Sequence, residues 1–67
     1  MQLSARNQLT GTIKTVSLGS IMAEVVVEVS GQEVVAEITK SSAQKLGLKT
    51  GDAVTVVIKS TDVMLAK

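Results

Sequence analysis

Residues 21–39 read IMAEVVVEVSGQEVVAEIT, and this stretch decides the fold. Within residues 21–29 one set of alternate positions is entirely apolar, while the other set carries Glu24 and Glu28. Residues 33–39 repeat this period-two pattern, which is typical of a strand with one buried face. The polar residues SGQ at 30–32 predict a short turn between them. The stretch therefore predicts an antiparallel hairpin that keeps its glutamates in water and buries valine and isoleucine on its other face.

Three further strands are predicted on either side of this hairpin. Residues 9–18 precede it and are rich in β-branched residues with rough alternation. Residues 53–59 follow it with Val and Ile at every second position. A polar break at residues 60–62 then separates this strand from a short terminal strand, which we expect over residues 63–66.

Residues 41–47, SSAQKLG, have a different pattern and predict one short helix. Ser41 and Gln44 have the spacing of a capping box, and Gly47 suits a left-handed C-cap position. Three strands, a helix and two strands, in that order, predict an all-β fold with one short helix, namely a five-stranded OB-like antiparallel barrel. We expect residues 1–67 to form a single domain.

Composition predicts that this barrel is oligomeric. A chain of 67 residues buries only about 60% of its unfolded surface on folding and is marginally stable alone. The sequence contains no Cys and no His, so disulfides and most structural metals are not available to stabilise it. Eleven valines and no Phe, Tyr or Trp favour thin sheets that pack within or between subunits.

Charge and hydropathy exclude two classes of partner. The formal net charge is +1 with the signs interspersed, and aromatic residues are absent, so the chain lacks both the basic stripe and the stacking platforms of a nucleic-acid binder. No signal-peptide pattern and no long apolar run is present. We therefore expect a cytoplasmic protein with no nucleic-acid partner and no membrane association.

The residue types predict that the protein is not an enzyme. Without His and Cys, an activated nucleophile reduces to a Ser–Lys pair, and Lys59 and Ser60, as neighbours on an extended chain, point to opposite sides. A bare metal ion is also not expected, because the predicted loops offer only Asp52 and Asp62, one in each.

Hydrogen-bond donors, by contrast, gather at the ends of predicted strands. They are Ser4, Arg6 and Asn7 before the first strand, Thr39, Ser41 and Ser42 at the start of the helix, and Lys59, Ser60 and Thr61 before the last strand. A helix N-terminus and a turn of successive N–H groups both attract anions. Thr39 or Ser41 also suits a simple N-cap, so capping alone is an alternative explanation for these hydroxyls.

Four segments of the chain together resemble a known family. They are SARNQLTG at residues 4–11, AEVVVEV at 23–29, ITKSSAQKLGLKTGD at 38–52 and VVIKSTDVMLA at 56–66. They closely resemble the molbindins, the molybdenum-pterin-binding or Mop proteins, as a single Mop domain of the TOBE type. The resemblance extends over essentially the whole chain.

This resemblance implies a cytoplasmic store or buffer for molybdate or tungstate that has no enzymatic activity. It implies an OB-like fold assembled as a homohexamer, a trimer of dimers. The family's oxyanion pocket, carried over by position, gives Ser4, Ala5, Arg6, Lys59 and Ser60 from one subunit and Thr39 and Ser42 from a neighbour. A second oxyanion site on a symmetry axis would be lined by Gly19, Ser20 and Ile21.

The chemistry of the expected ligand agrees with these residue types. Molybdate and tungstate are dianions without a proton at neutral pH, so their oxygens only accept hydrogen bonds, and a pocket of donors without a carboxylate suits them. Hydrogen bonds to a charged partner are roughly twice as strong as neutral ones. Nothing in the sequence indicates a pterin pocket. The alternative hypothesis is an OB-like oligomerisation module without a ligand, whose polar clusters only cap and solvate.

Overall fold

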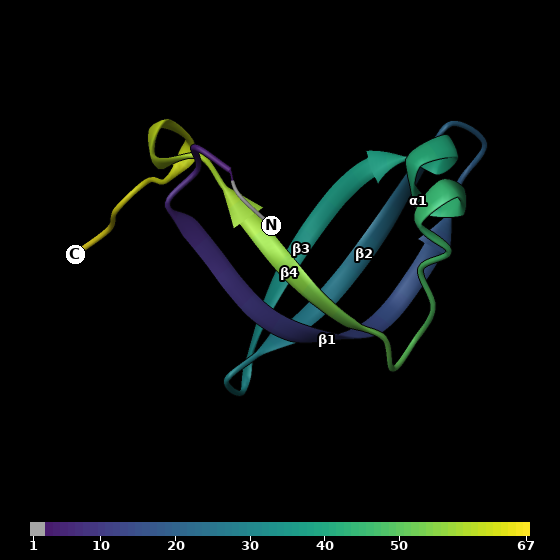
Figure 1. The fold of residues 1–67 in the computed structure, drawn as a ribbon, viewed down its shortest axis with the longest axis horizontal. Helices are drawn as coiled ribbons and strands as arrows, with labels where there is room; N and C mark the ends of the chain where they lie inside the picture. Colours follow the sequence, from purple (N-terminus) through teal and green to yellow (C-terminus); the bar gives the residue numbers. More distant parts are fainter. Residues whose placement is uncertain (1–2) are drawn as a thin grey trace.

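The computed structural model describes residues 3–67, which form one curved antiparallel sheet with a short helix (Figure 1). Its elements are β1 (Asn7–Leu18), β2 (Met22–Val29), β3 (Gln32–Thr39), α1 (Lys40–Leu46), β4 (Ala53–Ile58) and the 3-10 helix η1 (Ser60–Asp62). The strands lie in the order β3-β2-β1-β4. The predicted fold class, mostly β with one short helix, is confirmed.

Strand β1 pairs with a different partner in each half of its length. Its first half pairs with β4, from Asn7 opposite Ile58 onward, and its second half pairs with β2 as far as Leu18 opposite Ala23. The register shifts between Ile13 and Thr15, and such a bulge bends a strand and increases its twist. As a result β1 curves along the base of the molecule, with β4 rising on one side and β2 and β3 on the other (Figure 1).

Gly11 allows β1 to pass very close to β2 at this bend. A Cβ atom at residue 11 would lie 2.6 Å from the Glu28 carbonyl oxygen, 2.7 Å from Val27 Cγ1 and 2.8 Å from Val29 Cγ2. These distances are shorter than any side chain tolerates. The curvature of the sheet therefore depends on glycine at this position.

The buried face of the sheet is the one that the alternation predicted. Ile13, Ala23, Val25 and Val27 are between 1% and 3% exposed, and Ala43 of α1 is equally buried. The glutamates of β2 and β3 lie on the opposite, exposed face. Among residues 3–67 the longest helix is α1 with seven residues, and none is long and apolar enough to cross a membrane.

Two residues, Ser30 and Gly31, turn the hairpin between Val29 and Gln32. Both have a positive φ, 49° and 81°, as a type I′ turn requires, and this turn matches the twist of the two strands that it joins. The predicted hairpin is confirmed, and its second strand begins one residue earlier than expected because Gln32 already pairs with Val29.

An ion pair fastens the bulge of β1 to β3. Lys14 Nζ lies 2.6 Å from Glu33 Oε2, and both side chains are about half exposed. The hydrogen bond to Glu33, and then its negative charge, raise the pKa of Lys14 above its usual value. The contact therefore stabilises the fold at neutral pH, and the part that depends on the charge of Lys14 is lost as the pH rises through that raised pKa.

The helix begins earlier than predicted. Its N-cap is Thr39 rather than Ser41, because Thr39 Oγ1 accepts a hydrogen bond from the Ser42 N–H at 3.0 Å. This leaves Ser41 inside the first turn, so the predicted capping box between Ser41 and Gln44 is wrong. Gly47 is the C-cap with φ 62°, as predicted.

The fifth strand, expected over residues 63–66, is not formed. Within residues 3–67 the sheet has four strands, and the chain after Asp62 is extended without pairing. The 3-10 turn η1 directs the chain away from the sheet after β4, so the apolar tail meets no strand edge of its own molecule (Figure 1). The barrel is therefore open on one side.

We expect Gly11→Ala to lower the free energy of unfolding by about 1–3 kcal/mol, because the added methyl group overlaps the β2 backbone. Urea unfolding of both proteins at equal concentration measures the change, since assembly makes stability concentration-dependent. Thr10→Ser, at the exposed neighbouring position, is the control and should change it by less than about 0.5 kcal/mol. An unchanged stability of Gly11→Ala would mean that the two strands do not approach this closely.

Candidate functional site

The pairing of β1 with β4 brings the two ends of the described chain together. Asn7 lies opposite Ile58, so the residues before β1 and the residues after β4 leave the sheet at the same end. They enclose a hollow, which we call the terminal hollow. It is lined by Leu3, Ser4, Ala5, Val57, Lys59, Thr61 and Asp62.

The segment SARNQ divides into two functional halves in this region. Asn7 Nδ2 donates to the Ile58 carbonyl at 3.2 Å, and Gln8 Nε2 donates to the Ala5 carbonyl at 2.9 Å. The Asn7 amide thus holds the segment against β4, and the Gln8 amide closes a local turn within the segment. Ser4 and Ala5 line the terminal hollow, and among the described residues the side chains of Ser4 and Arg6 make no hydrogen bond.

The opposite wall of the terminal hollow is a tight turn. Lys59 is the N-cap of η1 without a side-chain cap, and its carbonyl accepts the Asp62 N–H at 2.9 Å. The turn places Lys59 and Thr61 at the hollow. Ser60 and Arg6 are also predicted site residues. Each is a chain neighbour of a lining residue, but neither lines the terminal hollow.

Asp62 also lines the terminal hollow, and the sequence analysis did not anticipate this. A carboxylate repels a dianion and accepts a proton-bearing ligand, so the hollow is not made of donors alone. The terminal hollow thus includes an acidic residue, which the expectation of a donor-only pocket did not include. Because the orientation of Asp62 follows from the 3-10 turn, strand periodicity could not reveal it.

A second hollow lies at the start of α1, and we call it the helix hollow. It is lined by Ser20, Ile21, Thr39, Lys40, Ser41 and Gln44. The Lys40 N–H donates to the Ile21 carbonyl at 2.7 Å, which ties the β1–β2 turn to the helix. Within one chain Thr39 thus lies with Ser20 and Ile21, two residues predicted for a separate site. Gly19 and Ser42 lie beside this hollow in sequence but do not line it.

Thr39 and Ser42 are linked to each other by two hydrogen bonds. The Ser42 N–H donates to Thr39 Oγ1, and the Thr39 hydroxyl donates to Ser42 Oγ at 2.8 Å. The Thr39 hydroxyl proton is therefore engaged in the cap, while the Ser42 hydroxyl keeps its own proton for another acceptor. The capping interaction uses both the oxygen and the proton of the Thr39 hydroxyl, but only the oxygen of the Ser42 hydroxyl.

The elements that carry the lining residues of the two hollows stand at opposite ends of the molecule (Figure 1). The N-terminal segment and η1 stand at one end, and α1 stands at the other. A single chain therefore does not bring Thr39 and Ser42 to Ser4 and Lys59.

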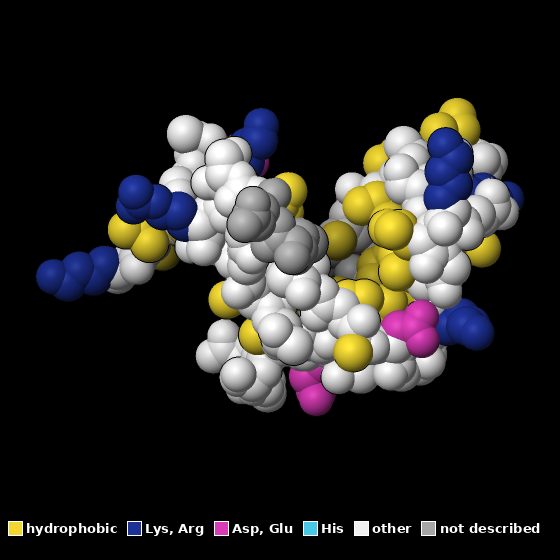
Figure 2. All heavy atoms as spheres, viewed as in Figure 1, with side chains coloured by type: hydrophobic (Ala, Val, Ile, Leu, Met, Phe, Trp, Pro, Cys, Tyr) yellow, Lys and Arg dark blue, Asp and Glu magenta, His cyan; other side chains and the backbone are white. Residues whose placement is uncertain are grey.

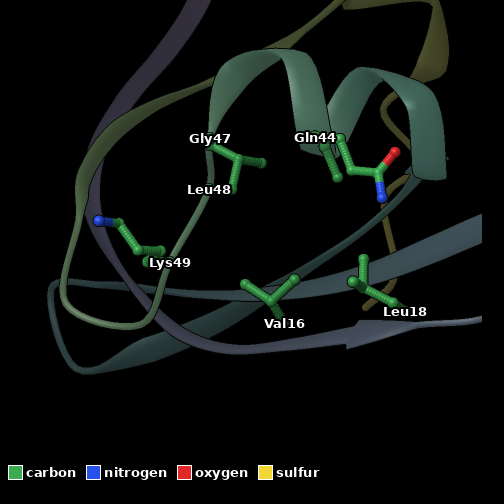
Figure 3. A pocket seen from close by; sticks show the side chains of 7 residues that line it. Val16, Leu18, Gln44, Gly47, Leu48 and Lys49 are labelled. Carbon is green, nitrogen blue, oxygen red and sulfur yellow. The ribbon is translucent and has the colours of Figure 1, made fainter.

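The remaining hollows are mainly apolar. One lies between β1 and the end of α1, where Val16 and Leu18 face Leu48, and only Gln44 and Lys49 supply polar side chains (Figure 3). The other is a wide apolar groove on the open side of the barrel (Figure 2). Among residues 3–67 no three acidic side chains gather as a bound cation would require.

Comparison with known proteins identifies the family. The TOBE domain family matches residues 3–65. Molybdenum-pterin-binding protein 3 of Clostridium pasteurianum is 48% identical over 97% of this chain and 97% of its own length. The chain belongs to the molybdenum-pterin-binding proteins of the TOBE family. The resemblance read from SARNQLTG and the three further segments is confirmed.

Two solved structures agree with this membership. A molybdate-binding protein from Sporomusa ovata superposes over the whole of both chains with a TM-score of 0.96 and 40% identity. The cytoplasmic molybdate-binding protein ModG, in a form with molybdate bound, has a TM-score of 0.84 and 44% identity. The match with ModG covers 90% of this chain but only 43% of ModG.

Proposed function

We propose that this protein binds molybdate or tungstate in the cytoplasm and serves to store the anion and keep its level steady. The observation that carries the proposal is the terminal hollow, where donors from the two ends of the chain converge in a member of a molybdate-binding family. Ser4, Lys59 and Thr61 line it with hydroxyl and ammonium groups, and Ala5 offers its backbone amide.

The anion would be held by neutral and charged donors acting together. Each hydroxyl or amide gains strength from the charge of its partner, and Lys59 adds a full positive charge. Arg6 and Ser60 are chain neighbours of lining residues, and small changes in the segments before β1 and after β4 would bring them to the same oxygens. We assign Ser4, Ala5, Arg6, Lys59 and Ser60 to one half of the pocket.

Thr39 and Ser42 of a neighbouring subunit would form the other half. Support comes from the free hydroxyl proton of Ser42 and from the distance between the two hollows in one chain. A second anion site at Gly19, Ser20 and Ile21 has weaker support, since only Ser20 and Ile21 line the helix hollow.

The proposal includes no catalysis. Among the described residues no side-chain hydrogen bond joins Ser4 or Thr61 to Lys59 or Asp62, so the terminal hollow holds no nucleophile paired with a base. The relatives named above are described as binding proteins, and one is seen with molybdate. A pterin is not part of the proposal, because no side chain in either hollow offers an aromatic stacking surface.

The assembly would be a homohexamer arranged as a trimer of dimers. Marginal chain length, an open barrel and exposed apolar side chains at Leu18, Ile21 and Met64 support self-association. Sedimentation equilibrium at micromolar concentration is expected to give six times the 7.0 kDa chain mass. A clean monomer would remove both the hexamer and the subunit-shared pocket.

Calorimetric titration with sodium molybdate tests the function. We expect saturable heat and a rise in melting temperature, because a ligand that binds only the folded protein stabilises it. Equimolar sulfate should not displace molybdate, since sulfate is too small to reach all the donors at once. Assembly without heat from either molybdate or tungstate would favour the alternative, an oligomerisation module without a ligand.

Two serine variants locate the site within the same titration. Ser60→Ala and Ser42→Ala should each weaken molybdate binding by about 1.5–3 kcal/mol, roughly tenfold or more, through loss of a charge-assisted hydrogen bond. Glu28→Gln, on the exposed face of β2, is the control and should bind as the parent does. Parental affinity in both serine variants would move the site elsewhere.

The carboxylate of Asp62 generates a separate prediction. Asp62→Asn removes a like charge from the terminal hollow, so molybdate affinity should rise roughly 3- to 10-fold at low salt and less at high salt. Phosphate keeps a proton at neutral pH and uses such an acceptor, so its affinity should gain less than that of molybdate. Competition calorimetry at two salt concentrations measures the molybdate and phosphate affinities. Glu28→Gln, which removes one negative charge away from the terminal hollow, is the control. Equal affinities in Asp62→Asn and the parent would show that this carboxylate does not face the anion.

A further inference from the structure

Asn7 stands at the point where the two walls of the terminal hollow separate. The β1–β4 ladder ends at the pair of Asn7 and Ile58, and beyond this pair the chain before β1 and the chain after β4 continue as the two walls (Figure 1). The Asn7 side chain reaches across to the Ile58 carbonyl, 51 residues away in sequence. Within the described part of the chain no other side-chain hydrogen bond joins the walls, and no backbone bond ties residues 3–6 to residues 59–63.

Each of the two walls is closed by a hydrogen bond of its own. On the first wall the Gln8 amide donates to the Ala5 carbonyl at 2.9 Å, which closes a turn. On the second wall the Asp62 N–H donates to the Lys59 carbonyl at 2.9 Å, which closes η1. The hydrogen bond of Asn7 is therefore the last tie between two small closed units.

The needs of the core do not explain an amide at this position. By the period of two along β1, Asn7 shares a face of the strand with Gly11 and with Ile13, which is 1% exposed. Ile58, directly opposite, is apolar and partly buried. A partly buried amide is costly in such surroundings unless it is hydrogen bonded, and an apolar side chain of the same size would suit the core at least as well. The role of the amide therefore lies in the carbonyl that it holds.

We propose that Asn7 is a positioning residue that fixes the width of the anion pocket and thereby determines which tetrahedral oxyanion it selects. The inference rests on the proposed function, and it gives Asn7 no contact with the anion, because Asn7 does not line the terminal hollow while Ser4 and Lys59 do, one on each wall. A pocket held at the width of molybdate rejects the smaller sulfate, since its walls cannot contract around it. Without the tie the walls move independently, so the donors are less well placed for molybdate and free to close on sulfate.

Asn7→Leu tests this role, because leucine keeps the size and branching of the side chain and lacks the N–H donor. Calorimetry on the full chain with sodium molybdate and sodium sulfate gives the ratio of the sulfate Kd to the molybdate Kd. We expect this ratio to fall roughly tenfold or more, as is typical when a residue that orients a binding group is lost. A variant that only unfolds more often would weaken both anions by the same factor, so a purely structural role leaves the ratio unchanged.

Gln32→Leu is the matched control for this experiment. It also replaces a primary amide with leucine, but at the first residue of β3, where the Gln32 side chain makes no hydrogen bond to the described residues. Its ratio of the two dissociation constants should equal that of the parent. An unchanged ratio in Asn7→Leu, whether the two affinities stay the same or weaken equally, would overturn the proposal.

A disulfide between positions 7 and 58 restores the tie without the amide. The natural chain has no Cys, so Asn7→Cys combined with Ile58→Cys forms one defined bond. Directly opposite residues of antiparallel strands have Cα atoms about 4.5–5.5 Å apart, a separation that a disulfide spans. We expect the parental ratio in the oxidised form and a ratio roughly tenfold lower in the reduced form of the same chain. Equal ratios in the two forms would overturn the proposal, and this comparison decides even where Asn7→Leu fails to fold.

Failure of this inference differs from failure of the proposed function. A parent chain that binds neither molybdate nor sulfate would contradict the proposed function, and the role of Asn7 with it. A parent chain that prefers molybdate, together with an unchanged ratio in Asn7→Leu and in the reduced double-cysteine variant, would leave the proposed function in place. That result would overturn only the role of Asn7.

Discussion

The double pairing of β1 is the constraint on which the rest of the structure depends. One strand forms ladders with β4 and β2 in turn, and it does so by bending where Gly11 lets two backbones approach and where the register shifts after Ile13. The bend makes a curved sheet out of four strands and leaves its concave face open. The bend also determines which segments outside the strands lie close together. Both ends of the described chain emerge beside the β1–β4 pair, and the helix with the β1–β2 turn emerges at the far end.

The polar segment before β1 illustrates how structural and binding roles are divided in a small chain. Asn7 and Gln8 hold backbone carbonyls, so their donors are already used. Ser4 and Ala5 stand where no strand pairing takes up their polar groups, at the edge of the terminal hollow. The same division occurs at the helix, where Thr39 serves the cap and Ser42 keeps a proton to donate. In both places a residue that fixes the backbone precedes or follows one that is free for a ligand.

Local patterns predicted local structure correctly, and the misses are those that depend on distant contacts. The alternation in residues 21–39 gave the hairpin, its buried face and its turn to within one residue, because side-chain period and turn chemistry are properties of the segment itself. Residues 63–66 are all apolar and suit a strand, but a strand also needs an edge to pair with, and η1 directs these residues away from their own sheet. Of the two N-cap candidates, Thr39 and not Ser41 caps the helix, because β3 runs directly into the helix.

The candidate site was predictable by residue type and only partly by place. The sequence named donors at the ends of predicted strands, and the β1–β4 register brings two of these groups together. Asp62 was missed because its position depends on a three-residue 3-10 turn, which has no periodic signal. The separation of Thr39 and Ser42 from Ser4 and Lys59 follows from strand order, a property of the whole sheet.

That separation has a thermodynamic consequence for a protein of this size. A pocket made from two subunits exists only in the assembly, so each anion that binds it stabilises association by the same free energy with which association improves binding. The chain alone buries few side chains completely, with Ile13 the largest that is less than 2% exposed. Little cohesion is then available from the core, and in the proposed assembly the interfaces would supply the rest. The ligand would then be part of what holds the proposed subunits together, and the level of free anion would set how much of the chain is assembled.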